Sequence, residues 1–583
     1  MPFFDRRAFL EYCSAAGLGG TLFPGALVAE AERQSDDEPI TPETIRAAEQ
    51  VAGLEFDEEE REMLVEDLND RLGEFEAMRS VELENETPPA FVFDPCVSGA
   101  VPPDGPDRLD WAPPAAPGRP ASDEDLAFAG IGTLAALLRS GDVTSVELTR
   151  LALRRLRRYD DELNAVVTLT EERAVRRARR ADEALASGNA RSPLHGIPYG
   201  AKDLLAVEGY ETTWGAAPFK NQDLGATTAA VIERLDEAGA VLVAKLSLGA
   251  LAWGDVWFGG TTKNPWNLDQ GSSGSSAGPG AAVSAGLVPF AIGSETLGSI
   301  VSPSTRTGVT GHRPTFGTVS RYGAMALSWT MDKLGPMARS AEDCALVYHA
   351  ICGDDPRDRS TVEAPFRYDA DRDVQNSRVG VLEGAFDSDY DDAQKEADQE
   401  ALGVLRSDLG LEMEPVAWPD DLPVGPLLMI LNAEAATAFD RLTRSGRDDE
   451  LTRQTKDAWP HVFRSARFIP AVEYLRANRI RTRLAQEAAR VTQDLDAIVA
   501  PSFAGHTLAL TNLTGHPAVV VPNDFRAAED GPDGSPRRQP GSLTFVGGLY
   551  RDAGPLRLAE AYQQATGFDE ERPPVGRLQI ENW

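Results

Sequence analysis

The chain has 583 residues, a length at which a single compact core is no longer the default. Its formal net charge of −35 repels nucleic acid phosphates and argues against general nucleic-acid binding. Hydrophobic residues make up 42% of the chain, and no apolar run beyond the extreme N-terminus is long enough to predict a membrane-spanning helix. Only seven of the 57 basic residues are lysines, so the position of each lysine is informative.

The first 31 residues have the pattern of a twin-arginine export signal. Arg6 and Arg7 precede a weakly apolar segment, residues 17–28, and the run AEA at 29–31 is a small-x-small cleavage site. We therefore expect residues 1–31 to be a signal peptide and the protein to be periplasmic or extracellular. The alternative is a cytosolic protein with an N-terminal helix.

Residues 32–97 form an acidic segment in which two helices are expected. The run TPE at 41–43 places a threonine N-cap before a proline at the first helical position, and Asp57 with Glu60 has the spacing of a capping box. Apolar residues then recur on one helical face over residues 64–78. This segment is predicted to be a helical N-terminal extension.

Residues 98–122 contain seven prolines, which predicts a semi-rigid linker or a strap on a surface. From residue 123 onward, helix-like and strand-like patterns alternate. This alternation predicts an α/β sheet covered by helices on both faces. The run 526–541 is expected to form an exposed hairpin. Strands are expected at 240–244, 379–382, 497–500 and 518–521, and helices at 145–159 and 171–186.

Two arginine clusters, at 150–158 and 173–180, lie on these predicted helices. Acidic residues stand close to both clusters in the sequence. Solvated helix faces are the simpler interpretation, and a patch that binds RNA or phosphate is the alternative.

The central third of the chain contains several unusual motifs. LHGIPYGAKD (194–203) places Lys202 after a strand-like segment that contains glycine and proline. GSSGSSAGPG (271–280) leads through small apolar runs to GSETLGSIVSP (293–303), and TGVTGHRPTFGTVSRYG (307–323) follows. Small hydroxylated residues thus stand beside segments that favour burial.

Together with KNPW (263–266), LDAIVAPS (495–502) and TNLTGHPAVVVP (511–522), these motifs resemble the amidase signature family. The resemblance covers roughly residues 130–575, and many ordered motifs at family-like spacing make it specific. It implies a large mixed β-sheet sandwiched between helices, here assigned to residues 123–583. It also implies hydrolysis of a carboxamide.

In that family a lysine, a serine in a cis peptide and a nucleophilic serine form the catalytic set. A gap-free alignment of the motifs puts these at Lys202, Ser275 and Ser299. A serine hydroxyl is a poor nucleophile until a base removes its proton. Lysine can be that base only when it is neutral, and burial lowers its pKa from about 10.4. Ser275 would then relay a proton from Ser299 to Lys202.

The turn Thr296-Leu297-Gly298-Ser299 is expected to form the oxyanion hole, because preorganised backbone N–H groups stabilise the charge that develops on the carbonyl oxygen. The sequence departs from the family pattern there. Leu297 replaces a glycine, which puts the backbone angles of the turn in doubt. Val301 replaces an arginine, which puts in doubt any charged network behind the nucleophile.

Three further residues are expected to support the site. Gly274 allows a tight turn before Ser275, Ser276 is expected to hydrogen-bond within the site, and Asp203 follows the lysine. Without the family context, Lys202 beside Asp203 would more often form an ion pair, and the two serines would be ordinary turn residues.

The function expected from these residues is an exported amidase that acts on a small-molecule amide without a metal or organic cofactor. Cys96, Cys344 and Cys352 are too few and too scattered for a disulfide framework or a metal site. One alternative is the A subunit of a tRNA-dependent amidotransferase, which the chain also resembles. Residues 40–90 in addition faintly resemble the C subunit of that complex. The other is a catalytically inactive binding relative. The sequence does not identify the acyl and amine parts of the substrate. It also leaves the oligomeric state open, and a homodimer is one alternative.

Overall fold

The computed structural model describes residues 40–574 except residues 86, 116–117, 388–391, 529 and 531–536. The predicted signal peptide lies outside the described residues. The chain divides into two compact units, Met1–Thr87 with Arg467–Glu473, and Pro88–Ala466 with Tyr474–Trp583. We describe each unit by itself. Within the part of the chain that the structure describes, no helix is both long enough and apolar enough to span a membrane.

The smaller unit contains helices α3 (Pro42–Ala52) and α4 (Glu58–Arg79), and both predicted caps are confirmed. Thr41 caps α3 by accepting the Thr44 N–H at 3.4 Å, with Pro42 at the first helical position. Asp57 and Glu60 form the capping box of α4, with reciprocal hydrogen bonds of 2.9 and 2.8 Å. Each cap satisfies backbone N–H groups that lack an intrahelical partner.

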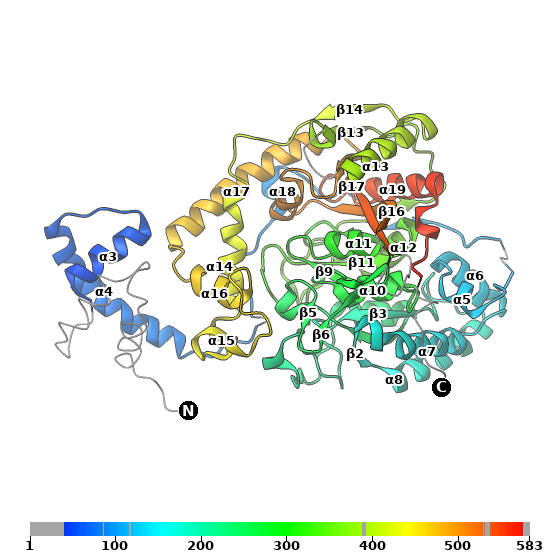
Figure 1. Cartoon of the computed structure of the whole chain (residues 1–583), viewed down its shortest axis with the longest axis horizontal. Coiled ribbons are helices and arrows are strands. Elements are labelled where there is room, and N and C mark those ends of the chain that lie inside the picture. The colour runs from blue at the N-terminus through cyan, green and yellow to red at the C-terminus, as the bar shows by residue number, and fades with distance from the viewer. Residues whose placement is uncertain are drawn as a thin grey trace. The chain divides into compact units, whose positions relative to one another are not determined.

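The larger unit is built on an eleven-stranded mixed sheet (Figure 1). The predicted fold class, a large mixed sheet with helices packed on it, is therefore confirmed. In spatial order the strands are β14 (Met413–Val416), β13 (Val379–Leu382), β15 (Ala497–Pro501), β17 (Arg537–Val546), β16 (Ala518–Ala528), β10 (Thr310–Arg313), β11 (Lys333–Ala338), β9 (Phe290–Glu295), β3 (Pro198–Lys202), β4 (Val241–Leu246) and β2 (Val166–Leu169).

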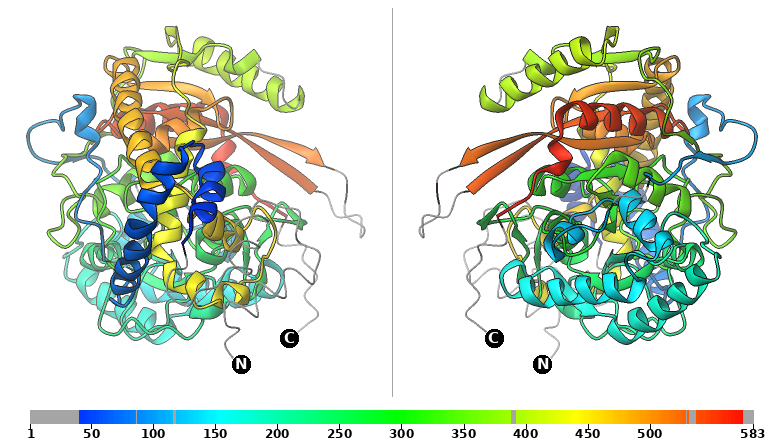
Figure 2. Two further views of the ribbon diagram at one scale, coloured as in Figure 1. Left: turned by 90° about the vertical axis from the view of Figure 1, so that its left-hand side faces the viewer. Right: turned by 90° about the vertical axis from the view of Figure 1, so that its right-hand side faces the viewer.

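The sheet mixes parallel and antiparallel pairs. Strand β3 runs parallel to both neighbours, β4 and β9, whereas β11 pairs antiparallel with β9 and β10. Strands β16 and β17 pair antiparallel as far as Ala528 and Arg537, and the hairpin extends beyond the body of the unit (Figure 2). The hairpin predicted over 526–541 is thus confirmed for its described residues.

Short strands also form outside the main sheet. Strand β1 (Arg108–Asp110) belongs to the proline-rich segment and pairs parallel with β12 (Arg367–Asp369). This pairing favours the strap over the semi-rigid linker for that segment. Two further pairs join β5 (Val256–Trp257) to β6 (Gly260–Thr261), and β7 (Lys263–Asn264) to β8 (Asn267–Gly271).

Several helices pack on strands of the sheet, among them α8 on β4 and α12 on β11, and α8 begins and ends at the residues predicted for it. The helices that follow α4 along the chain are α5 (Asp123–Ala127), α6 (Ile131–Ser140), α7 (Ser145–Leu163), α8 (Glu171–Ala186), α9 (Ala230–Ala238), α10 (Ala277–Ser284), α11 (Val301–Thr307), α12 (Ala341–Ile351), α13 (Asp392–Gly403), α14 (Met429–Ala438), α15 (Asp440–Arg444), α16 (Trp459–Ala466), α17 (Ala471–Thr492), α18 (Thr507–Thr514) and α19 (Ala553–Thr566).

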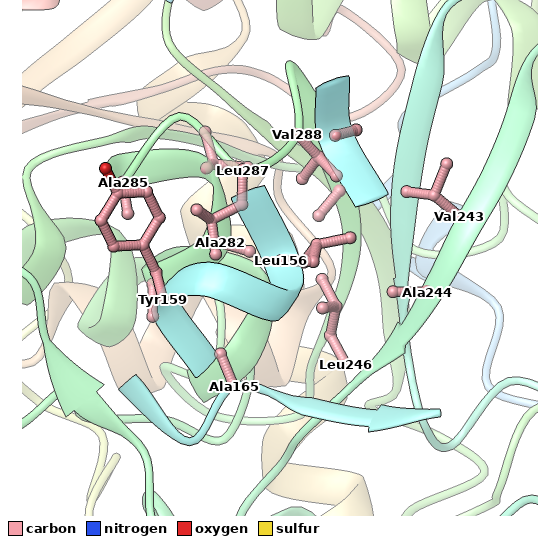
Figure 3. Close-up of a cluster of buried hydrophobic side chains, with 14 of the residues drawn as sticks. Leu156, Tyr159, Ala165, Val243, Ala244, Leu246, Ala282, Ala285, Leu287 and Val288 are labelled. Carbon is pink, nitrogen blue, oxygen red and sulfur yellow. The ribbon is translucent and has the colours of Figure 1, made fainter. Parts of the chain in front are cut away.

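A buried apolar cluster fixes helix α10 against its neighbours (Figure 3). Leu156 and Tyr159 of α7 lie in it with Val243 of β4 and Ala282 of α10. Full burial of a leucine or valine side chain contributes about 1.5–3 kcal/mol. Because α10 follows directly after the serine-rich motif, this core holds the motif in place.

Candidate active site

Lys202 is the last residue of β3, and its side chain is fully buried. Its Nζ donates hydrogen bonds to Ser275 Oγ at 2.8 Å, Ser276 Oγ at 3.0 Å and Ser294 Oγ at 2.9 Å. Burial lowers the pKa of Lys202 well below its ordinary value, and the charges of Asp332 and Glu295 oppose that effect only in part. The environment therefore favours the neutral amine, which can accept a proton.

Ser275 precedes Ser276, the N-cap residue of α10, and has 1% of its surface exposed. The peptide bond between Gly274 and Ser275 is cis, the geometry that the family resemblance implies. At Gly274 no larger residue fits, because an ideal Cβ would lie 1.9 Å from the carbonyl oxygen of Gly254. The close approach of the Gly254 backbone therefore explains the glycine that precedes Ser275.

Ser276 links the start of α10 to the end of β9. Its Oγ donates to the carbonyl of Ser294 and accepts from the Ser294 N–H, both at 3.1 Å. Its own N–H donates to the carbonyl of Ser299 at 3.2 Å. These contacts bring the segments of Ser275 and Ser299 together, as the sequence predicts.

Ser299 lies in the turn between β9 and α11, with 8% of its surface exposed. Among the described residues, its hydroxyl makes no hydrogen bond, to Ser275 or to any other group. Its backbone carbonyl nevertheless joins it to Ser276. The relay from Ser299 through Ser275 to Lys202 therefore stays a prediction, and the Ser299 hydroxyl is not engaged elsewhere.

The turn that contains Ser299 presents free backbone donors. In the described part of the chain, the N–H groups of Leu297, Gly298 and Ser299 have no hydrogen-bond acceptor. Gly298 has φ of 80°, in the left-handed region that favours glycine, whereas Leu297 does not. The replacement of glycine by Leu297 is therefore compatible with the turn. Thr296 holds the start of the turn by donating from Oγ1 to Asp332 Oδ1 at 2.6 Å.

A buried carboxylate organises the residues that follow the predicted nucleophile. Glu295 Oε2 accepts the N–H groups of Ile300 and Val301 at 2.8 and 3.0 Å, at the first turn of α11. Its Oε1 accepts from Arg313 and Asn512, both at 2.8 Å. Burial acts to raise the pKa of Glu295, but Arg313 and these hydrogen bonds outweigh it and lower the pKa to about 2. Glu295 therefore stays ionised.

Asp203 does not pair with Lys202. Its carboxylate forms an ion pair with Lys245 at 2.7 Å and accepts from Thr213 N–H and Oγ1 at 2.9 and 2.5 Å. Both partners of the ion pair are fully buried. Asp203 thus ties β3 to β4, while the lysine next to it in sequence faces hydroxyl groups.

Two residues of the cluster were not anticipated from the sequence. Ser294 accepts from Lys202, and its place in the strand just before the turn was an available signal. Asp332 contacts Thr296 from a loop distant in sequence, and no motif pointed to it. Across the described ranges, no cluster of three or more His, Cys, Asp or Glu residues could hold a metal ion.

Comparison with known proteins relates the chain to a large group of enzymes. A family model described as Amidase matches residues 147–547. The A subunit of the glutamyl-tRNA(Gln) amidotransferase of Roseiflexus sp. (strain RS-1) is 34% identical over 486 residues, which cover 76% of this chain and 96% of the relative. The corresponding A subunit of Marinomonas sp. (strain MWYL1) is 30% identical over 482 residues, covering 77% and 99%.

Solved structures show the same likeness. The native peptide amidase from Stenotrophomonas maltophilia has a TM-score of 0.65 and 28% identity, covering 76% of this chain and 98% of that chain. A structure reported for a vestigial protein complex and the origins of an s-triazine catabolic enzyme has a TM-score of 0.67 and 29% identity, covering 75% and 99%. The motifs, the mixed sheet and these relatives agree, and the chain belongs to the amidase signature family.

Proposed function

We propose that the protein is an amidase that hydrolyses the C–N bond of a carboxamide through an acyl-enzyme on Ser299. Ser275 relays the proton, and Lys202 is the base. The observation that carries this proposal is the fully buried Lys202 amine, which is surrounded by serine hydroxyls and has a pKa lowered by burial. A neutral amine hydrogen-bonded to a serine is a suitable general base.

The proposed reaction has two halves. Ser299 Oγ attacks the carbonyl carbon while its proton passes through the Ser275 hydroxyl to Lys202 Nζ. The oxyanion that forms is bound by the free N–H groups of 297–299. When the C–N bond breaks, the proton returns from Lys202 to the leaving nitrogen, and an ester on Ser299 remains. A water molecule, deprotonated through the same relay, then releases the carboxylate and restores Ser299.

Labelling with a fluorophosphonate probe tests this assignment without knowledge of the substrate. We expect mass spectrometry of the labelled wild-type protein to locate the probe on Ser299. Ser299→Ala should abolish labelling, and Lys202→Ala should reduce it strongly. Ser302→Ala, in the first turn of α11, is the matched control and should label normally. An unlabelled wild-type protein, or a Ser299→Ala variant that still labels, would falsify the proposal.

A second candidate is the release of ammonia from glutamine for a transamidase, because the relatives from Roseiflexus and Marinomonas are named as amidotransferase A subunits. The net charge of −35, the predicted export signal and Val301 in place of an arginine weigh against work on tRNA. Ammonia release from glutamine that requires added amidotransferase partner subunits would favour this candidate. Turnover of simple amides by the purified protein alone would favour the first.

The proposal includes export by the twin-arginine pathway and a small-molecule amide as the substrate. A screen of aliphatic, aryl, fatty and peptide amides against the purified protein would identify the acyl and amine groups. Fusing the first 31 residues to a reporter, with and without Arg6→Lys and Arg7→Lys, tests export. A reporter that stays in the cytoplasm with the native segment would contradict this part of the proposal.

A further inference from the structure

Helix α8 (Figure 1) carries several arginines that the proposed amidase reaction does not use, and together with Arg191 they form a surface. We call it the α8 basic surface and define it as Arg173, Arg176, Arg177 and Arg180 of α8 together with Arg191. A cavity of about 300 Å³ is lined by the four helical arginines. A second cavity of about 80 Å³ is lined by Arg177, Arg180 and Arg191. Because Arg177 and Arg180 line both cavities, the surface is continuous.

Positive charge exceeds negative charge on this surface. Asp236 lines both cavities and pairs with Arg173 at 2.6 Å and with Arg177 at 2.9 Å. Among the residues that the structure describes, no carboxylate lies within 4 Å of Arg176, Arg180 or Arg191. The other carboxylate that lines the larger cavity is the exposed Glu208. The α8 basic surface thus carries five guanidinium groups and two carboxylates, although the net charge of the protein is −35.

Two buried polar atoms beside this surface lack a protein partner. In the described part of the chain, neither Arg173 Nη1 nor the Tyr199 hydroxyl has a hydrogen-bond acceptor or donor within reach. Burial raises the pKa of Tyr199, and the charge of Asp236 adds to the rise, so the hydroxyl stays a neutral donor. A buried polar atom without a hydrogen-bond partner lowers the stability of the folded protein. An oxygen-rich ligand would reduce this cost at Arg173.

The chemistry and size of the larger cavity select the ligand. The planar guanidinium fork binds phosphate oxygens through two parallel hydrogen bonds. Tyr210 and Thr228 also line the cavity and add an aromatic ring and a hydroxyl group. A volume near 300 Å³ suits a small molecule. A long nucleic acid would meet the repulsion of the whole acidic protein.

We propose that the α8 basic surface binds a small molecule that carries a phosphate or pyrophosphate group. Arg176 and Arg180, which have no acidic partner among the described residues, make the principal contacts. Arg173 and Arg177 stay anchored to Asp236 and provide a fixed wall. This site stands independently of the amidase assignment.

Isothermal titration of the full-length protein with pyrophosphate, in a buffer without competing oxyanions, tests the proposal. We expect saturable binding at one site that weakens as NaCl is raised. Arg176→Ala with Arg180→Ala should weaken binding about tenfold or more, since each removes a charge-assisted hydrogen bond. Arg150→Ala with Arg179→Ala removes the same charge from exposed positions that line neither cavity, and it should change the affinity less than about twofold.

Three outcomes would overturn the proposal. The first is no saturable binding of pyrophosphate to the wild-type protein. The second is equal weakening by the control pair, which would indicate a nonspecific charge effect. The third is an oligonucleotide that binds the same arginines as tightly as pyrophosphate. Arg176→Lys with Arg180→Lys keeps the positive charge but removes the guanidinium fork, so an intermediate affinity of this variant supports bidentate binding. Thermal unfolding verifies that each variant is folded.

Discussion

At the scale of single residues, the Lys202 amine is the group whose protonation state decides the proposed chemistry. Lys202→Ala should slow fluorophosphonate labelling of Ser299 by about 10²–10⁴-fold at pH 7. The loss should be smaller at pH 10, where hydroxide competes as the base. Labelling rates of the wild-type and variant proteins at both pH values test this, with the exposed Lys220→Ala as the control. Equal losses at pH 7 and pH 10 would argue against a base role.

Glu295 illustrates how one carboxylate stabilises the segment after the predicted nucleophile. Glu295→Gln should lower the free energy of unfolding at pH 7 by about 3–5 kcal/mol, because it leaves Arg313 buried without a counter-charge. Glu171→Gln breaks a half-exposed pair with Arg157 and should cost about 0–1 kcal/mol. Urea unfolding of both variants makes the comparison.

The same carboxylate predicts a pH dependence. The folded state lowers the pKa of Glu295 from 4.5 to about 2, so its ionised form stabilises the fold above about pH 4.5. That stabilisation is lost as the pH falls toward 2. The deficit of Glu295→Gln relative to the wild-type protein should therefore shrink over this range. A deficit that stays constant down to pH 2 would mean that the charge of Glu295 is not the stabilising factor.

At the scale of secondary-structure elements, the segment that leads into α10 depends on a close backbone approach. In Gly274→Ala the new Cβ would lie 1.9 Å from the Gly254 carbonyl, so the segment that carries Ser275 must shift. We expect Ser299 labelling to fall at least about tenfold, while the far-ultraviolet circular dichroism stays that of the wild-type protein. Gly403→Ala, which meets no atom within 4 Å, is the matched control. Normal labelling of Gly274→Ala would show that the loop tolerates the shift.

Local sequence patterns predicted individual helices and strands well, because the formation of each helix or strand depends largely on residues that are close together in the sequence. Helix α8 spans the predicted residues 171–186, and β13 spans the predicted 379–382. The order of strands depends instead on contacts between distant segments. Strand β9 lies between β3 and β11, and no periodicity in the sequence encodes that position.

The same distinction holds in the candidate site: residues in local motifs could be predicted, whereas contacts between distant segments could not. The motifs pointed to Lys202, Ser275 and Ser276, and the structure brings these residues together. The Asn512 contact to Glu295 spans 217 positions in sequence, so only the folded chain reveals it. The catalytic roles of these residues stay predictions until labelling tests them.

At the scale of the whole molecule, the large acidic excess should make stability depend on salt. Repulsion among surface charges destabilises the folded state, and salt shortens its range from about 10 Å at 0.1 M to about 3 Å at 1 M. The thermal unfolding midpoint at pH 7 should therefore rise with NaCl over this interval. The rise should be smaller near the isoelectric point of 4.6, where the net charge is small. An unchanged midpoint at pH 7 would contradict this prediction.

In the described part of the chain, serine hydroxyls and no carboxylate hydrogen-bond to the Lys202 amine, and this affects the stability of the folded protein. Below about pH 10.4 Lys202 is protonated in the unfolded state, whereas burial lowers its pKa in the folded state. Protonation of Lys202 therefore favours unfolding. Lys202→Met should therefore give an inactive protein that melts at a higher temperature than its parent, by a margin larger at pH 7 than at pH 10. The Lys202 side chain that the proposed activity requires is thus expected to lower the thermal stability of the protein.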